Sequence, residues 1–276
     1  MPEPNAVRLL DLGLIESWRT QAIYHAIAET MTAETLDTLV VCRPDTPYLC
    51  LGYHQVLERV LDRTACTELG LPVYRRRVGG GLTYLDQNQL FYQCIFHETR
   101  VPVKARDVYA RMLQAPVATL SRLGLDAELR FENEIEVGDR RVAGIGGARI
   151  GEAMVVVGNL LFDFDRPMLA RVWRAPSESF RERAASALGE RLVTLKELLG
   201  SVSRDTVRDL LLEEFERALG GRLEPGVLTP EEEAHARVVR ERMSSPPYLD
   251  LHREPGDVEP MTRLKISARV SVEEAV

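Results

Sequence analysis

The segment from Leu71 to Tyr84 constrains the fold most strongly, because a short apolar run leads into three arginines and then three glycines. The run Leu71–Arg75 predicts a strand, and the glycines end it in a loop, since glycine suits turns and close ligand approach. The residues concerned are Arg75, Arg76, Arg77, Gly79, Gly80 and Gly81. Backbone N–H groups of such a loop can face an anion, and arginine offers forked donors for phosphate or carboxylate. The segment predicts an anion-binding loop; the alternative is an exposed basic turn with a flexible glycine hinge.

Composition limits the classes of protein to consider. With 276 residues, 45% hydrophobic and 28% charged, the chain suits one large soluble domain, or one domain with a small appendage. A net charge of −7 argues against bulk nucleic-acid binding and, beside a basic loop, favours a small anionic ligand. No apolar stretch approaches the length of a membrane span, and residues 1–5 lack the features of a signal peptide. We therefore expect a cytoplasmic protein without a membrane partner.

The cysteines carry information about reaction chemistry. The chain has four, Cys42, Cys50, Cys66 and Cys94, and none follows Cys94. They form no Cys-x-x-Cys pair, and no Cys or His spacing indicates zinc. We expect buried, reduced thiols.

Hydrophobic periodicity predicts an α+β domain over residues 1–200. Helical spacing appears at 17–30, 57–70 and 107–123, and strand patterns at 38–42, 48–53, 71–75, 90–96 and 153–164. Residues 134–144 alternate and turn at Gly138-Asp139, which predicts a hairpin.

The C-terminal part is expected to be helical and smaller. A helix is predicted over 204–219, and another begins after Thr229, with Pro230 at its first position and acids in its first turn. We assign residues 201–253 to a small helical accessory segment and 254–276 to a tail of uncertain order.

Two further segments could share a pocket with the arginine–glycine loop. The first, a second basic turn that runs into glycines, spans residues 140–147. The second is Gly158-Asn159, a glycine within an apolar strand, which often marks close approach of a ligand or backbone. Two such turns in one domain favour a functional site over structural turns.

These segments resemble the lipoate-protein ligase and octanoyltransferase superfamily, whose core fold is shared with biotin-protein ligases. The resemblance runs through most of residues 5–250 and rests on the first loop and on Gly52-Tyr53-His54-Gln55, Asn133-Glu134, Gly138–Gly144, Gly158–Leu161 and Arg191–Leu195. It implies a biotin/lipoate protein ligase-like α+β fold: a mixed sheet flanked by helices, with a small helical C-terminal extension.

The resemblance also implies an activity. ATP with Mg²⁺ would convert lipoate or octanoate to an acyl-adenylate, and the acyl group would pass to a lysine of a lipoyl carrier domain. That carrier would be of the glycine-cleavage H type or the 2-oxoacid dehydrogenase E2 type. Arg141 would be catalytic, and Asp86 would hold the loop or Mg²⁺. Residues implied in binding the substrate or adenylate are Arg75, Arg76, Arg77, Gly79, Gly80, Gly81, Tyr84, Asn133, Ala143, Gly144, Gly146, Gly158 and Asn159.

Three positions depart from the family pattern. Arg141 stands where the family has a lysine that stabilises developing charge, and arginine keeps the charge but not the compact ammonium. Leu85 and Val157 stand where the family has histidines. The chain has only three lysines against 32 arginines, so compositional drift can explain the first departure but not the other two.

Two alternatives follow. A non-catalytic or repurposed homologue that binds an acyl group or a lipoylated protein would keep the glycine framework and lose the polar positions. A cysteine-dependent octanoyltransferase is disfavoured, because the family's nucleophile would lie near 125–135 or 165–180, where this chain has no cysteine.

Overall fold

A six-stranded sheet forms the centre of the molecule in the computed structural model, which describes residues 6–274. Its strands lie in the order β10 (Ala143–Ile150), β11 (Ala153–Leu161), β6 (Gln89–His97), β2 (Thr38–Pro44), β1 (Val7–Ile15) and β12 (Leu223–Pro225). Neighbouring strands from β10 to β2 pair antiparallel, whereas β1 pairs parallel with β2 and β12. The sheet is mixed, as predicted.

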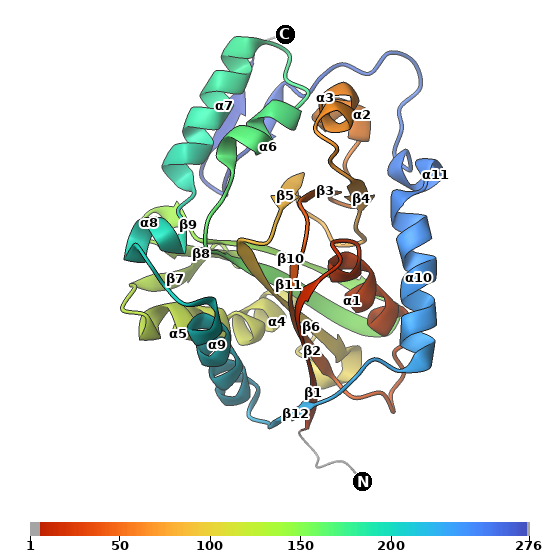
Figure 1. The fold of residues 1–276 in the computed structure, drawn as a ribbon, viewed down its shortest axis with the longest axis vertical. Coiled ribbons are helices and arrows are strands. Elements are labelled where there is room, and N and C mark those ends of the chain that lie inside the picture. Colours follow the sequence, from red (N-terminus) through yellow and green to blue (C-terminus); the bar gives the residue numbers. More distant parts are fainter. Residues whose placement is uncertain (1–5, 275–276) are drawn as a thin grey trace.

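Helices cover both faces of this sheet, which explains why all of β6 is buried. α1 (Arg19–Glu29) lies on one face, and α4 (Ala105–Met112), α5 (Gln114–Arg122) and α9 (Arg204–Leu219) lie on the other (Figure 1). Tyr24 and Ile27 enter the core on the α1 side, and Leu211 and Phe215 enter it on the α9 side.

The predicted anion loop is held by a second, three-stranded sheet. Its strands lie in the order β4 (Val73–Arg75), β3 (Tyr48–Leu51) and β5 (Thr83–Leu85), so the loop joins two strands that both pair with β3. The elements packed around it are α2 (Leu57–Val60), α3 (Arg63–Glu68), α6 (Arg166–Val172) and α7 (Glu178–Arg191). Both ends of the loop are therefore fixed.

A third sheet carries the predicted hairpin. β7 (Ala127–Arg130), β8 (Glu134–Val137) and β9 (Arg140–Arg141) pair antiparallel in that order. The turn between β8 and β9 places Gly138 at φ 61°, a left-handed conformation that favours glycine. The hairpin prediction is confirmed.

The C-terminal part returns along the molecule. α9 and β12 join the main core and sheet, α10 (Pro230–Ser244) packs beside α1, and α11 (Pro246–Leu249) follows (Figure 1). Residues 201–225 thus share the main body's core, although the sequence assigned them to an accessory segment. η1 (Glu98–Arg100) and α8 (Leu195–Leu199) complete the helices.

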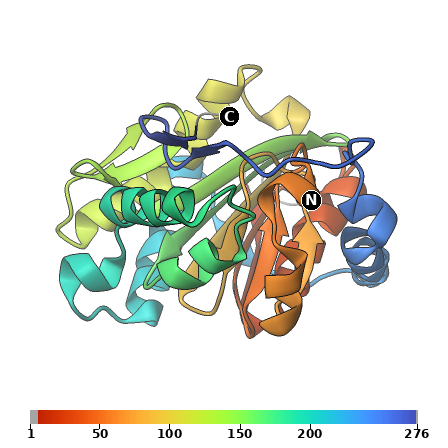
Figure 2. The same ribbon diagram turned by 90° about the horizontal axis from the view of Figure 1, so that it is seen from above.

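Residues 254–274 take a defined path, whereas the sequence suggested a tail of uncertain order. The chain crosses the face that Figure 2 turns toward the viewer and forms β13 (Arg263–Lys265) and β14 (Ser271–Glu273), which pair with each other. Met261 and Ile266 are buried in the core beside α6 and α7. These two apolar side chains anchor the segment.

Two predicted helices are interrupted. The helix expected over 57–70 divides into α2 and α3, because Leu61 between them forms a bridge with Trp173. The helix expected over 107–123 divides into α4 and α5 near Leu113, and Pro116, which has no N–H to donate, lies in the first turn of α5. Helices were predicted correctly over 204–219 and after Thr229, whose hydroxyl caps α10 in a capping box with Glu232.

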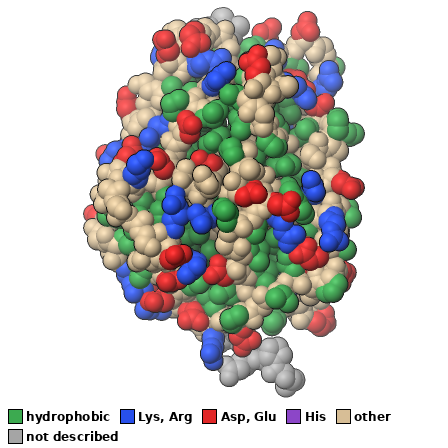
Figure 3. Space-filling model, viewed as in Figure 1, with side chains coloured by type: hydrophobic (Ala, Val, Ile, Leu, Met, Phe, Trp, Pro, Cys, Tyr) green, Lys and Arg blue, Asp and Glu red, His purple; other side chains and the backbone are tan. Residues whose placement is uncertain are grey.

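Charged side chains of both signs are interspersed on the face in Figure 3, with hydrophobic side chains between them. Within residues 6–274, no helix has the length and apolar character needed to cross a bilayer.

Candidate functional site

A cavity of about 90 Å³ lies between α1, the main sheet and the arginine–glycine loop. All three segments singled out in the sequence reach it. The lining is Gln21, Tyr24, Arg76, Thr83, Leu85, Phe91, Gln93, Gly144, Ile145, Gly146, Val157, Gly158 and Asn159. The wall is mainly apolar with a few polar groups, as a pocket for an acyl chain requires.

Arg75 does not reach the cavity. Its side chain is fully buried, and its guanidinium donates to the carbonyls of Gly52, Tyr53 and Gln55 at 3.2, 2.8 and 2.7 Å and also to that of Leu249. The predicted contact between Arg75 and a ligand is not available in this arrangement. Arg75 holds the neighbouring turn and the end of α11 instead.

Arg76 lines the cavity and shapes the loop. Its guanidinium donates to the carbonyls of Cys50, Gly79 and Gly81, each at 2.9 Å. The loop is therefore folded around one arginine side chain. A ligand anion would meet a guanidinium whose position is already fixed.

Arg77 contacts α1 and does not line the cavity. Its backbone N–H donates to Nε2 of His25 at 2.9 Å, and its guanidinium donates to Glu29 at 3.1 Å. Nδ1 of His25 lies 2.7 Å from the carbonyl of Gln21, so Nδ1 carries the proton and Nε2 accepts. Burial lowers the pKa of His25 to about 4, so the ring is neutral at physiological pH.

The glycines of the loop have different roles. Gly80 has φ 99°, where side chains are strained, and its carbonyl lies where a Cβ on Gly52 would be placed. A Cβ on Gly79 or Gly81 would meet nothing. Backbone packing therefore requires glycine at Gly52 and Gly80, while Gly79 and Gly81 leave open space beside the loop.

A chain of amides joins the cavity wall to the loop. The backbone N–H of Gly144 donates to Oδ1 of Asn159 at 2.8 Å, and Nδ2 of Asn159 donates to Gln89. Gln89 donates in turn to the carbonyl of Tyr84 at 3.1 Å. Asn159 thus uses its amide to fix β10 against β11, and one face of it lines the cavity.

Gly158 and Gly146 are explained by neighbouring side chains. A Cβ on Gly158 would overlap the ring of Tyr92 on the paired strand, and one on Gly146 would lie 2.7 Å from Val78 of the loop. The close approach predicted at Gly158 is real, but its partner is Tyr92. Ala143, one residue before Gly144, is fully buried in the main core.

The alternation along β5 separates two predicted residues from the cavity. Thr83 and Leu85 line it, whereas Tyr84 points to the opposite core, where its ring packs edge-on against Phe164. Asp86 accepts hydrogen bonds from the backbone and side chain of Asn88 at 2.8 and 3.3 Å. Burial raises the pKa of Asp86. Tyr84 does not line the cavity, so its predicted contact with a ligand is not seen in this arrangement.

The described residues contain no group of three or more His, Cys, Asp or Glu side chains that could hold a metal ion. Asp86 could contribute one carboxylate to Mg²⁺, which is commonly bound by one or two carboxylates together with substrate phosphates and water.

Arg141 lies on β9, outside the cavity lining. Its guanidinium is 3.8 Å from Glu134, and its backbone carbonyl accepts from Val193 at 2.9 Å. Asn133, the residue before Glu134, is exposed in the turn that precedes β8. Phe131 and Glu132 in the same turn have φ of 48° and 69°, which is strained for residues with side chains.

The C-terminal segment covers this hairpin. The backbone N–H of Ala268 donates to Glu134 at 2.7 Å, and Arg269 donates to Glu136 and Asp139, each at 2.8 Å. Glu134 and Glu136 are 6% and 1% exposed, so Arg269 neutralises the buried carboxylate of Glu136, and the Ala268 N–H supplies a hydrogen bond to that of Glu134. The sequence pattern gave no signal for them.

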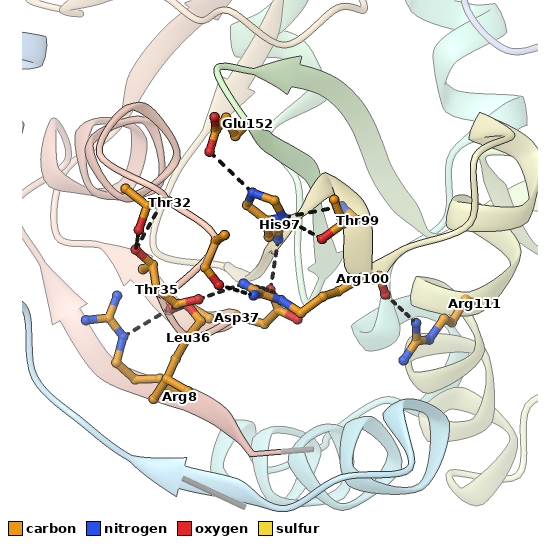
Figure 4. Close-up of polar contacts among 12 residues, drawn as sticks. Arg8, Thr32, Thr35, Leu36, Asp37, His97, Thr99, Arg100, Arg111 and Glu152 are labelled. Carbon is orange, nitrogen blue, oxygen red and sulfur yellow. Dashed lines mark hydrogen bonds and ion pairs between the residues drawn. The ribbon is translucent and has the colours of Figure 1, made fainter. Parts of the chain in front are cut away.

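His97, the last residue of β6, is buried although it ends a strand. The side chain is 4% exposed, and its ring lies 2.8 Å from the hydroxyl of Thr99 and 3.3 Å from Glu152 (Figure 4). Its backbone N–H donates to Asp37, which also accepts from Arg100. This cluster fixes the far end of β6 and takes no part in the cavity.

The four cysteines are buried and unpaired, as predicted. None lines the cavity. Burial raises the pKa of each thiol, to about 11 for Cys66. None is placed or ionised as a nucleophile requires.

Sequence reasoning missed the contribution of α1. Gln21 and Tyr24 line the cavity, while His25 and Glu29 hold the loop. The signal was polar side chains on a helix whose residues from Thr20 to Ala28 are all buried. Helical periodicity shows which face is apolar, but not which buried polar group meets a distant loop.

Comparisons with known proteins show which family this chain is similar to. The family model of the lipoyl protein ligase A/B catalytic domain matches residues 17–216. An octanoyltransferase LipM of Symbiobacterium thermophilum is 30% identical, over 85% of this chain and 94% of its own. The lipoate-protein ligase A subunit 1 of Thermoplasma acidophilum is 28% identical, over 68% and 74%.

Solved structures show the same fold. The bi-partite lipoate protein ligase of Thermoplasma acidophilum, studied with its E2 lipoyl domain, superposes with a TM-score of 0.82 at 27% identity, covering 90% of this chain and 98% of that one. A lipoate-protein ligase A bound with ATP gives 0.76 at 26% identity, covering 89% and 99%.

Proposed function

Because the chain belongs to the lipoyl protein ligase A/B catalytic-domain family, we propose that it activates lipoate or octanoate with ATP and transfers the acyl group to a lysine of a lipoyl carrier domain. The observation that carries the proposal is the mainly apolar cavity whose lining includes Arg76, Gly144 and Gly146. An acyl chain would lie against the apolar wall, and the Arg76 guanidinium would meet its charged end.

The placement of the thiols favours a ligase over a cysteine-dependent transferase. Acyl transfer through a thioester needs a thiolate beside the acyl group, and no cysteine lines the cavity. Activation with ATP needs no protein nucleophile, because the acid itself attacks the nucleotide phosphate. The structural relative bound with ATP supports this choice.

Each residue then has a defined task. Arg76 would contact the acyl carboxylate or the adenylate phosphate, and Arg141 would stabilise the charge that develops there after leaving Glu134. Mg²⁺ would neutralise the phosphates of the nucleotide, with Asp86 as a candidate ligand. The partner would carry a lysine on a lipoyl domain of the H type or the E2 type, and the relative studied with its E2 lipoyl domain supports a lipoyl-domain partner.

Pyrophosphate release tests the proposal. Purified protein is given ATP and Mg²⁺ with lipoate, octanoate or biotin, each alone. Release that depends on lipoate or octanoate is expected. No release with any acid would refute the ligase function.

One observation favours a second candidate, a non-catalytic homologue that binds an acyl group or a lipoylated protein. Leu85 and Val157 line the cavity where the family has histidines, and Arg141 pairs with Glu134 outside it. On this alternative, calorimetry would detect lipoate or octanoate binding while pyrophosphate release stays at background.

A further inference from the structure

The carboxylate of Glu29 joins the arginine–glycine loop to the C-terminal helix α10. It accepts from Arg77 at 3.1 Å, from His235 at 2.8 Å and from Arg242 at 2.5 Å. Its side chain is only 11% exposed. Burial alone would raise the pKa of Glu29. The hydrogen bonds from Arg242 and His235 outweigh this effect and lower the pKa to about 2, so the carboxylate is charged at physiological pH.

Without these partners, the end of α1 would be an unfavourable position for the negative charge of Glu29. It is the last residue of α1, where the helix dipole disfavours negative charge. Helix formation therefore gives no reason for an acid here. The reason lies in the cations that reach it from two distant parts of the chain.

On the loop side, α1 holds Arg77 twice. Glu29 binds the guanidinium, and His25, one turn earlier, accepts the backbone N–H. Arg76, the preceding residue, lines the cavity and binds the carbonyls of Gly79 and Gly81. A shift of Arg77 would therefore move the side chain that shapes the loop.

On the C-terminal side, residues 242–249 also contact Arg75, the residue before Arg76. Arg242 lies over the ring of Tyr248 at 5.8 Å, and the carbonyl of Leu249 accepts from Arg75. The residues on both sides of Arg76 are thus tied, directly or through Glu29, to residues 235–249.

We propose that Glu29 is a positioning residue through which α10 fixes the arginine–glycine loop over the cavity. Glu29 does not line the cavity, and it acts through Arg77. The effect on acid affinity rests on the proposed function; the effect on loop conformation does not.

The chain offers a matched control. Glu233 of α10 pairs with Arg19 of α1 at 2.5 Å, so this ion pair joins the same two helices without touching the loop. The test compares Glu29→Gln with Glu233→Gln. Hydrogen exchange is followed on residues 76–83, and the Kd of lipoate and octanoate is measured by calorimetry.

We expect loop amides to exchange about tenfold faster in Glu29→Gln than in wild type, and Glu233→Gln to match wild type there. Where the wild type binds an acid, Glu29→Gln should raise its Kd about five- to tenfold and Glu233→Gln should leave it unchanged. Both variants should remain folded, because each keeps the shape of the side chain.

Equal loop exchange in the two variants would overturn the inference. A wild type that neither binds an acid nor releases pyrophosphate would refute the proposed function alone, because loop exchange still decides the role of Glu29. Faster loop exchange with unchanged acid affinity would refute the link between loop position and binding.

Discussion

At the scale of single residues, the glycine positions show how differently glycine can be used within one site. Gly158 makes room for Tyr92, Gly52 makes room for the backbone of Gly80, and a Cβ on Gly79 would meet nothing. A glycine pattern in a sequence therefore predicts a site more reliably than it predicts which glycine faces the ligand.

Gly158→Ala should destabilise the protein, because its Cβ would overlap the buried Tyr92 ring in a β-strand that cannot move freely. Overpacking of this kind costs roughly 1–3 kcal/mol. Urea denaturation measures the change. Gly189→Ala is the control, since that helical glycine has open space and should gain stability by up to about 1 kcal/mol. Equal stability of the two variants would contradict the expected clash.

Arg141 gives a residue-scale test of chemistry. If Arg141 works as a replacement for the family's lysine, Arg141→Lys should preserve or raise acid-dependent pyrophosphate release, and Arg141→Ala should reduce it by about 10²–10³-fold. The neighbouring Arg140→Ala is the control, because that side chain is exposed. If neither arginine nor lysine at position 141 supports pyrophosphate release, the result favours the non-catalytic alternative.

At the scale of elements, α1 couples stability to pH through His25. The pKa of His25 falls from 6.5 in the unfolded chain to about 4 in the fold, so the unfolded state binds more protons between these values. Stability should therefore fall as pH is lowered from 6.5 toward 4. For a ring that is fully buried, the loss between pH 7 and 4.5 is roughly 2–3 kcal/mol.

The measurement is urea denaturation at several pH values. His25→Gln should lose most of this pH dependence, because glutamine can still accept from Arg77 but does not titrate in this range. His54→Gln, at an exposed position, should keep it. A wild type and a His25→Gln variant with parallel pH profiles would show that His25 is not the titrating group.

The sequence predicted elements well where one pattern decides them. The apolar run of β11 and the capping residues around Thr229 placed those elements correctly, because both signals are local. The divided helix at Leu61 could not be predicted, since its partner Trp173 lies more than a hundred residues away. The buried role of Arg75 could not be predicted for the same reason, because its acceptors come from two distant segments, residues 52–55 and Leu249.

At the scale of the whole molecule, the family fold and the convergence of the basic and glycine-rich segments could be predicted because their motifs are short and spaced characteristically. The contacts that hold these segments in place could not be predicted. It depends on buried charges that meet only after folding, such as Arg269 of the C-terminal segment and Glu136 of the hairpin that carries Arg141.

That last contact allows a test of how the C-terminus supports the site. Among residues 6–274, Arg269→Ala would leave Glu136, 1% exposed, with Arg191 at 3.9 Å as its remaining cationic neighbour within ion-pair distance. Removing one partner of a buried pair costs several kcal/mol, and because Arg269 is 34% exposed we expect about 1–3 kcal/mol by urea denaturation.

The control lies in the same C-terminal hairpin. Arg263 pairs with Glu273 where both side chains are exposed, so Arg263→Ala should change stability by less than about 0.5 kcal/mol. Adding Glu136→Gln to Arg269→Ala should recover part of the loss, because the unpaired buried charge is then removed. If the double variant is no more stable than Arg269→Ala, the loss arises from packing against Phe131, over whose ring Arg269 lies at 5.0 Å, rather than from the charge of Glu136.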